Sequence, residues 1–169
     1  MATATERRSA KSLSTFLAGL QAGMVGVWWM LAWMGASAVW QRHSFWTPEN
    51  LMASVFYGNA AIRRGFGAST VSGLALYVLV YSLLGAGFAI ALGGRLPRPR
   101  LALASIAFAL CWYFAAFHLA AKTVWPLVVL LDTERTTFLG HALYGALLAR
   151  FPVYLPCAAE LPVASAPED

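Results

Sequence analysis

Two histidines lie in apolar stretches of this chain that contain almost no other ionisable residue. His118 lies within the charge-free run 101–121, and His141 lies within a second run at 136–149. An ionisable side chain within an apolar helix marks a candidate functional site, because burying its charge in hydrocarbon is costly. Neutral imidazole is also a common ligand of metals and of haem iron. The sequence therefore indicates His118 and His141 as its leading candidates for chemistry.

Several chemistries are open to these two rings. Facing each other at one depth, they could serve as axial ligands of haem b, ligate the metal of a chlorin pigment, or hold copper. They could also bind a quinone or carry protons. Tyr144 lies one turn after His141 and is a secondary cofactor contact. His43, which follows the first apolar run, is a secondary metal ligand on the same side.

A structural role for the histidines is the main alternative. Each ring could hydrogen-bond across a helix bundle to a backbone carbonyl, or to the hydroxyl of Tyr77, Tyr81 or Tyr144. No carboxylate occurs within an apolar run to orient a ligating ring, and this favours the structural role.

The composition defines the kind of protein that must position these rings. Of the 169 residues, 60% are hydrophobic and only 11% are charged, whereas a water-soluble chain has about 25% charged residues. Runs without Asp, Glu, Lys or Arg cover residues 12–41, 65–94 and 101–121, and a shorter one covers 136–149. About 20 such residues cross a bilayer as a helix. We therefore expect an integral membrane protein with four spanning helices.

The expected fold is all-α, a polytopic membrane four-helix bundle. A single transmembrane domain at 13–152 lies between a disordered basic head at 1–12 and a disordered tail at 153–169. An interfacial helix at about 48–63 joins the first two spans, with Thr47 as its hydroxyl N-cap and Pro48 in its first turn. The four spans are expected at about 13–40, 68–92, 101–121 and 133–151.

The two halves of the chain resemble one another. Tryptophans thirteen residues apart occur in both halves, and the segment 70–77 aligns with 137–144. This pattern predicts a parallel duplication of a helical hairpin about an axis along the membrane normal. Chance is the alternative, because the matching residue types are common in this chain. In the alignment Leu74 takes the place of His141 and Val39 that of His118, so the histidines would be particular to the second half.

Small residues indicate which helix faces should meet neighbours. Gly19, Gly23 and Gly26 form a strip that lets another helix approach closely, and an internal helix is the expected neighbour. His118 ends a stripe of small residues in the third span that is expected to face the bundle interior, as is His141 in the fourth. The stripe comprises Ala104, Ala107, Cys111, Ala115 and His118.

The basic residues indicate an orientation. With the N-terminus inside, the inner ends of the spans hold seven Lys or Arg and the outer loops hold five, which favours both termini in the cytoplasm. His118 and His141 would then share a depth near the outer surface. A cleavable signal peptide ending at 36–38 is the alternative. The apolar run before it is longer than the roughly 7–15 residues of a signal core, and it contains Trp28, Trp29 and Trp33.

Other chemistries find no support in the sequence. The seven acidic residues fall at the ends of helices or in loops, so neither a paired-carboxylate mechanism nor a pump with a buried acid is expected. The twelve basic residues form no stripe, so no nucleic-acid partner is expected. Cys111 and Cys157 form neither a CxxC nor a zinc pattern. No Walker loop, HExxH or GxSxG motif occurs.

Three short motifs carry a resemblance to a group of known proteins. They are Trp46-x-Pro48-x-x-Leu51, the turn Gly65-Phe66-Gly67, and His141-Ala-Leu-Tyr144-Gly145. Over most of residues 15–150 the chain resembles small four-helix bacterial inner-membrane proteins of unassigned function. The resemblance implies a bacterial inner-membrane location and assigns no activity to any residue.

Together these patterns favour a non-enzymatic membrane subunit that packs against partner helices in a larger respiratory or photosynthetic complex. Its partners would be the lipid bilayer and other membrane-protein subunits. The first alternative is a redox or pigment-binding protein that holds haem b or a chlorin through His118 and His141. The second alternative is a small transporter, against which the lack of buried charge and of paired Gly/Pro breaks counts.

Overall fold

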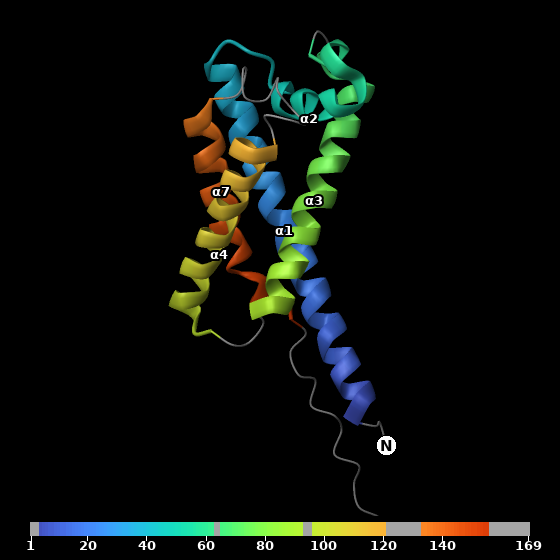
Figure 1. Cartoon of the computed structure of the whole chain (residues 1–169), viewed down its shortest axis with the longest axis vertical. Helices are drawn as coiled ribbons and strands as arrows, with labels where there is room; N and C mark the ends of the chain where they lie inside the picture. Colours follow the sequence, from blue (N-terminus) through green and yellow to red (C-terminus); the bar gives the residue numbers. More distant parts are fainter. Residues whose placement is uncertain (1–3, 63–64, 93–95, 121–132, 156–169) are drawn as a thin grey trace, which may run out of the picture.

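The computed structural model describes residues 4–62, 65–92, 96–120 and 133–155, and the regular elements within these ranges are all helical (Figure 1). Three helices are long and apolar enough to cross a membrane, at Ser9–Trp40, Ala68–Leu92 and Arg98–Leu119. The prediction of an all-α membrane protein is therefore confirmed. The four-span bundle and the internal duplication stay predictions, because the last long helix is shorter than these three.

The elements follow the predicted order with a few irregular turns. They are α1 (Ala4–Trp40), α2 (Thr47–Tyr57), the 3₁₀ turn η1 (Gly58–Ala60), α3 (Ala68–Leu92), α4 (Arg98–Tyr113), the π-helix η2 (Phe114–Ala120), α7 (Glu134–Leu148) and the 3₁₀ turn η3 (Phe151–Tyr154). At about 1.5 Å per residue, the 15 residues of α7 cover about 22 Å, which is less than the roughly 30 Å of a bilayer core.

The long helix α1 is the centre of the molecule. Figure 1 shows α1 in blue along the full length of the bundle, with α3 in green on one side and α7 in orange on the other. α4 packs against α7, and α2 lies across the end of the bundle where α1 ends and α3 begins. The N-terminal end of α1 extends beyond the other helices.

Glycines let α1 approach its neighbours. A Cβ atom added at Gly85 of α3 would lie 2.5 Å from the carbonyl oxygen of Gly19, and one at Gly23 would lie 2.5 Å from the carbonyl oxygen of Tyr81. Gly26 lies against the ring of Tyr144 in α7. The prediction that this glycine strip packs on an internal helix is therefore confirmed.

The predicted interior face of the third span is wrong in part. The residues of α4 that the structure buries are Leu101, Ser105, Ala109 and Tyr113. This face meets α7 at Gly145, where an added Cβ would lie 2.8 Å from the carbonyl oxygen of Ser105. Of the expected stripe, Ala104 packs against the core, whereas Ala107 and Cys111 are exposed. Ser105 and Ala109 are also small, so the chain offers two stripes and the glycine of α7 selects one.

Three predicted boundaries also differ. The basic head expected to be disordered is helical from Ala4, because Ala, Glu, Arg and Lys favour helix and the apolar run continues the same helix. Thr47 is the first residue of α2 and does not cap it, because Trp46 occupies the N-cap position. The interfacial helix expected over about 48–63 ends at Tyr57 and is followed by η1. Residues 63–64 and the tail from 156 lie outside the described residues.

Candidate functional site

His141 lies on the buried face of α7. The face repeats every three or four residues, through Thr137, Gly140, His141, Tyr144, Gly145 and Leu148. Only 4% of the surface of His141 is exposed. This places the ring between α7 and α3, as expected for a residue that faces the bundle interior.

Both ring nitrogens of His141 are engaged in hydrogen bonds. Nδ1 lies 2.7 Å from the carbonyl oxygen of Thr137, and Nε2 lies 2.6 Å from the hydroxyl of Tyr81. A carbonyl oxygen only accepts, so Nδ1 carries the proton and donates it. In the neutral ring Nε2 is then the acceptor, and the Tyr81 hydroxyl donates to it. The contacts therefore select one tautomer of a neutral imidazole.

The same two helices are joined by a second hydrogen bond in the reverse direction. The hydroxyl of Tyr144 in α7 donates to the carbonyl oxygen of Tyr81 in α3, at 2.7 Å. The rings of Tyr81 and Tyr144 pack edge to face with their centroids 5.0 Å apart. Tyr77 packs on Tyr81 from the preceding turn of α3, at 5.8 Å. Tyr81 and Tyr144 thus act as cross-bundle partners, which favours the structural reading of His141.

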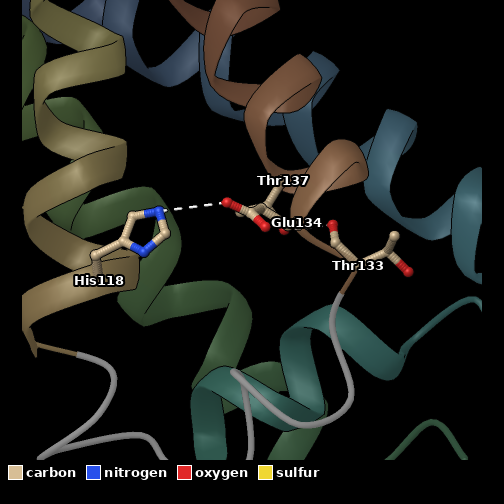
Figure 2. A network of polar contacts seen from close by, with 4 residues as sticks. All are labelled: His118, Thr133, Glu134 and Thr137. Atoms are coloured by element: carbon tan, nitrogen blue, oxygen red, sulfur yellow. Dashed lines mark hydrogen bonds and ion pairs between the residues drawn. The ribbon is translucent and has the colours of Figure 1, made fainter.

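His118 occupies a different environment. It lies in the π-helix η2 and stacks on Phe114 with ring centroids 5.0 Å apart. Its Nε2 lies 3.5 Å from Oε1 of Glu134, which is an ion-pair distance but not a hydrogen bond. Figure 2 shows His118 reaching from η2 towards the first turn of α7, where Thr133, Glu134 and Thr137 lie. The carboxylate that could orient a histidine ring is therefore Glu134, which the sequence did not pair with His118.

Tyr113 is the link between the two histidines. Its ring centroid lies 5.7 Å from that of His118 and 5.3 Å from that of His141. Glu134 and Thr137 form a second link along α7, because Glu134 faces His118 and the carbonyl of Thr137 accepts from His141. The structure therefore brings both histidines to one aromatic ring.

The donor set does not fit a group held between the two histidine rings. His141 has no nitrogen left for a metal while it bonds Tyr81 and Thr137. Among the described residues, no three His, Cys, Asp or Glu side chains lie close enough to hold a metal ion. His43 is exposed in the turn after α1. A haem or chlorin would have to break the hydrogen bonds of His141 before it could be ligated there.

A buried polar cluster between α2 and α3 was missed in the sequence. Oδ1 of Asn50 accepts hydrogen bonds from the hydroxyls of Ser69, at 3.1 Å, and Thr70, at 2.8 Å. Its Nδ2 donates to the carbonyl of Gly65, at 3.3 Å. These bonds fix the first turn of α2 against the first turn of α3. The Ser-Thr pair is visible in the sequence, but its partner Asn50 stands about 20 residues away and carries no local signal.

Glu49 is the most unusual member of this region. The sequence places it in the first turn of a helix, and only 2% of its surface is exposed. Oε2 of its carboxyl has no hydrogen-bond partner within the described part of the chain. Burial raises the pKa of Glu49 from 4.5 to about 7, because the charged form loses its water. Glu49 lies at a helix end as expected and is nevertheless buried, so a position at a helix end does not exclude a buried acid.

The burial of Glu49 follows from a glycine in α3. A Cβ added at Gly73 would overlap the backbone carbonyl of Glu49. Because Gly73 has no side chain, α2 lies directly on the backbone of α3 at this point. In the sequence, Gly73 is one residue of the segment 70–77 that aligns with 137–144. Its contact with Glu49 is visible only in the three-dimensional structure.

Comparison with known proteins gives no family for this chain: no protein-family model matches it, and no curated protein or solved structure shows significant similarity to it.

Proposed function

We propose that this protein is a non-enzymatic integral membrane subunit of a bacterial inner membrane, a four-helix bundle that packs against partner helices in a larger respiratory or photosynthetic complex. Both termini would face the cytoplasm. The polar contacts of the bundle support a structural role, since His141, Tyr81 and Tyr144 satisfy one another across α3 and α7. A ring whose nitrogens are both engaged stabilises a bundle and leaves no position for a ligand.

The observation that carries the proposal is the incomplete covering of α4. In the most apolar part of the candidate span Arg98–Leu119, which includes α4, only 28% of the residues are buried. The corresponding share is 50% in Ser9–Trp40 and 39% in Ala68–Leu92. Leu103 of α4 is 71% exposed, and Leu119 of the following η2 is 73% exposed. The same side of α4 as Leu103 presents the small residues Ala107 and Cys111. Small residues on a spanning helix let a second helix approach closely, so this side of α4 is suited to a partner.

Photo-cross-linking from α4 in native membranes tests the proposal. A photoreactive side chain at Leu103 faces outward, whereas one at Ser105 faces α7 and serves as the matched control. We expect Leu103 to give an adduct with a distinct membrane protein, identified by mass spectrometry, and Ser105 to give none. The proposal fails if no position on α4 gives an adduct with a distinct membrane protein.

Glu49 favours a small proton-coupled transporter as the second candidate. A carboxyl whose pKa lies near 7 can take up and release a proton in the physiological range. It lies in α2, outside the three candidate spans, which is an unusual place for a coupling acid. Flux assays in proteoliposomes with a pH gradient test this candidate. It requires substrate-dependent flux that Glu49→Gln abolishes, and the absence of flux would remove it.

A further inference from the structure

One face of α1 carries a regular seam that no part of the described chain covers. Leu17 and Trp28 are 53% and 50% exposed, and Met24 between them is 38% exposed. Gln21 is exposed on the same face. The four positions are spaced by four, three and four residues. This is the spacing of the core positions of a two-stranded coiled coil, in which the repeat averages about 3.5 residues.

The seam is separate from the packing face of α1 within the bundle. Gly19 and Gly23 on the opposite face contact α3, and Gly26 contacts α7. α1 therefore has one face committed to its own bundle and a second face free for another helix. This second face also differs from the outward side of α4 described above.

Gln21 lies at membrane depth. Its neighbours Gly19 and Gly23 lie against Ala89 and Ser82 of α3, so Gln21 stands level with the last turns of α3 before Leu92. Within the described ranges its amide has no hydrogen-bond partner, and the side chain points away from the bundle. An amide that is left unpaired in hydrocarbon is unfavourable, because it has lost its hydrogen bonds to water.

The chemistry of the amide identifies its partner. A glutamine side chain has both donors and an acceptor, so two glutamines at the same depth can satisfy one another. Two copies of one chain insert in the same orientation, and a two-fold axis along the membrane normal brings Gln21 against Gln21. A single polar residue among apolar core positions is a known device for fixing the register of such a pair. An unrelated helix would need its own amide at this depth by coincidence.

The position of Trp28 also indicates that a protein helix packs on this face of α1. Tryptophan in membrane proteins gathers at the membrane–water interfaces, where its ring meets the head groups. Trp28 instead lies near the middle of the candidate span Ser9–Trp40, half exposed. A large aromatic ring at that depth is typical of a protein contact, where tryptophan contributes strongly.

We propose that α1 pairs with α1 of a second copy of this chain through the seam of Leu17, Gln21, Met24 and Trp28, with the two Gln21 amides hydrogen-bonded to each other. This inference deepens the proposed function, because it names one partner of the subunit. It does not depend on the partner that docks on α4.

Disulfide cross-linking in membranes tests the pairing. In a Cys111→Ser, Cys157→Ser background, a cysteine replaces Met24, and a matched cysteine replaces Leu79, which is 57% exposed on α3. Mild oxidation should link Met24→Cys into dimers and leave Leu79→Cys monomeric. Adding Gln21→Leu should reduce the dimer at least several-fold, whereas Gln21→Asn should retain a substantial fraction. Thermal unfolding in detergent checks that each variant is folded.

The outcomes separate this inference from the proposed function. Equal cross-linking at both positions, none at Met24, or no effect of Gln21→Leu in a folded variant would overturn the pairing. The subunit proposal would still stand if Leu103 on α4 gave an adduct with a distinct membrane protein. Dimers through Met24 with no adduct from α4 would support the seam and reject the heteromeric assembly.

Discussion

Tyr81 and His141 lie 60 residues apart in sequence, and the hydroxyl of the first is 2.6 Å from Nε2 of the second. This contact joins α3 to α7 and, together with the Thr137 carbonyl, holds the imidazole neutral in one tautomer. His141, a leading candidate ligand in the sequence, therefore takes part in the packing of α7 against α3.

Removing the hydroxyl should therefore weaken the bundle. Tyr81→Phe leaves Nε2 of His141 buried without a donor, and we expect the free energy of unfolding to fall by about 1–2 kcal/mol. Tyr57→Phe is the matched control, because its hydroxyl bonds Ser72 at an exposed position, 3.0 Å away. That change should cost less than about 0.5 kcal/mol. Unfolding by denaturing detergent in mixed micelles measures both, and equal losses would contradict the assignment.

The purified protein should show no Soret or chlorin absorption band. The reason is that Tyr81 and Thr137 occupy both nitrogens of His141, and the ring of Tyr113 packs between the two histidines. An absorption spectrum from 350 to 700 nm, on about micromolar protein, and metal analysis of the same sample measure this. A Soret band that His141→Ala removes and His43→Ala leaves intact would restore the redox alternative.

The spans could be predicted because they depend on composition alone. The charge-free runs place α3 at Ala68–Leu92, as the sequence indicated, since a helix in lipid needs a sustained apolar length. The close packing of Gly19 on α3 could also be predicted, because small residues have few other roles in a spanning helix. Both features can be predicted because each depends on the residues of a single segment.

The partners across the bundle could not be predicted in the same way. Three tyrosines were candidate partners for His141, and the choice of Tyr81 depends on the vertical register of α3 against α7. Both helices pack on α1 through a glycine, α3 at Gly85 and α7 at Gly140, so their register depends on contacts with a third helix. The burial of Glu49 also depends on contacts between helices and was missed. An acid in the first turn of a helix is favourable when exposed, so the sequence alone gives no reason to expect it buried. The contact with Gly73 and the hydrogen bonds of Asn50 show that α2 lies against α3 there.

The stability of the protein should fall as the pH rises through the titration of Glu49. Its pKa is 4.5 in the unfolded chain and about 7 in the folded one, where burial favours the neutral form. The folded state therefore binds the extra proton, so this contribution is fully present below pH 4.5 and is lost as the pH rises towards 7 and above it.

Glu49→Gln should remove this pH dependence. The amide stays neutral at every pH, so the difference in unfolding free energy between the variant and the wild type should grow in the variant's favour from pH 5 to pH 8, reaching on the order of 1 kcal/mol. Glu134→Gln is the control, because the Glu134 side chain is 66% exposed. Unfolding midpoints measured at several pH values decide the point. Parallel curves for Glu49→Gln and the wild type would show that the carboxyl is hydrated in the folded state.

The contact of α2 with α3 should depend on Gly73 and not on Gly87, a second glycine of α3. A Cβ at Gly73 overlaps the backbone carbonyl of Glu49, and a backbone atom cannot move aside as a side chain can. Gly73→Ala should therefore destabilise the protein by about 1–3 kcal/mol, as overpacking does. Gly87→Ala in the same helix meets nothing within 4 Å, so it should be neutral or slightly stabilising. Labelling of a cysteine at Ala53, which is buried in the wild type, should become faster in Gly73→Ala only. Equal labelling rates in the two variants would mean that α2 is held by the Asn50 hydrogen bonds alone.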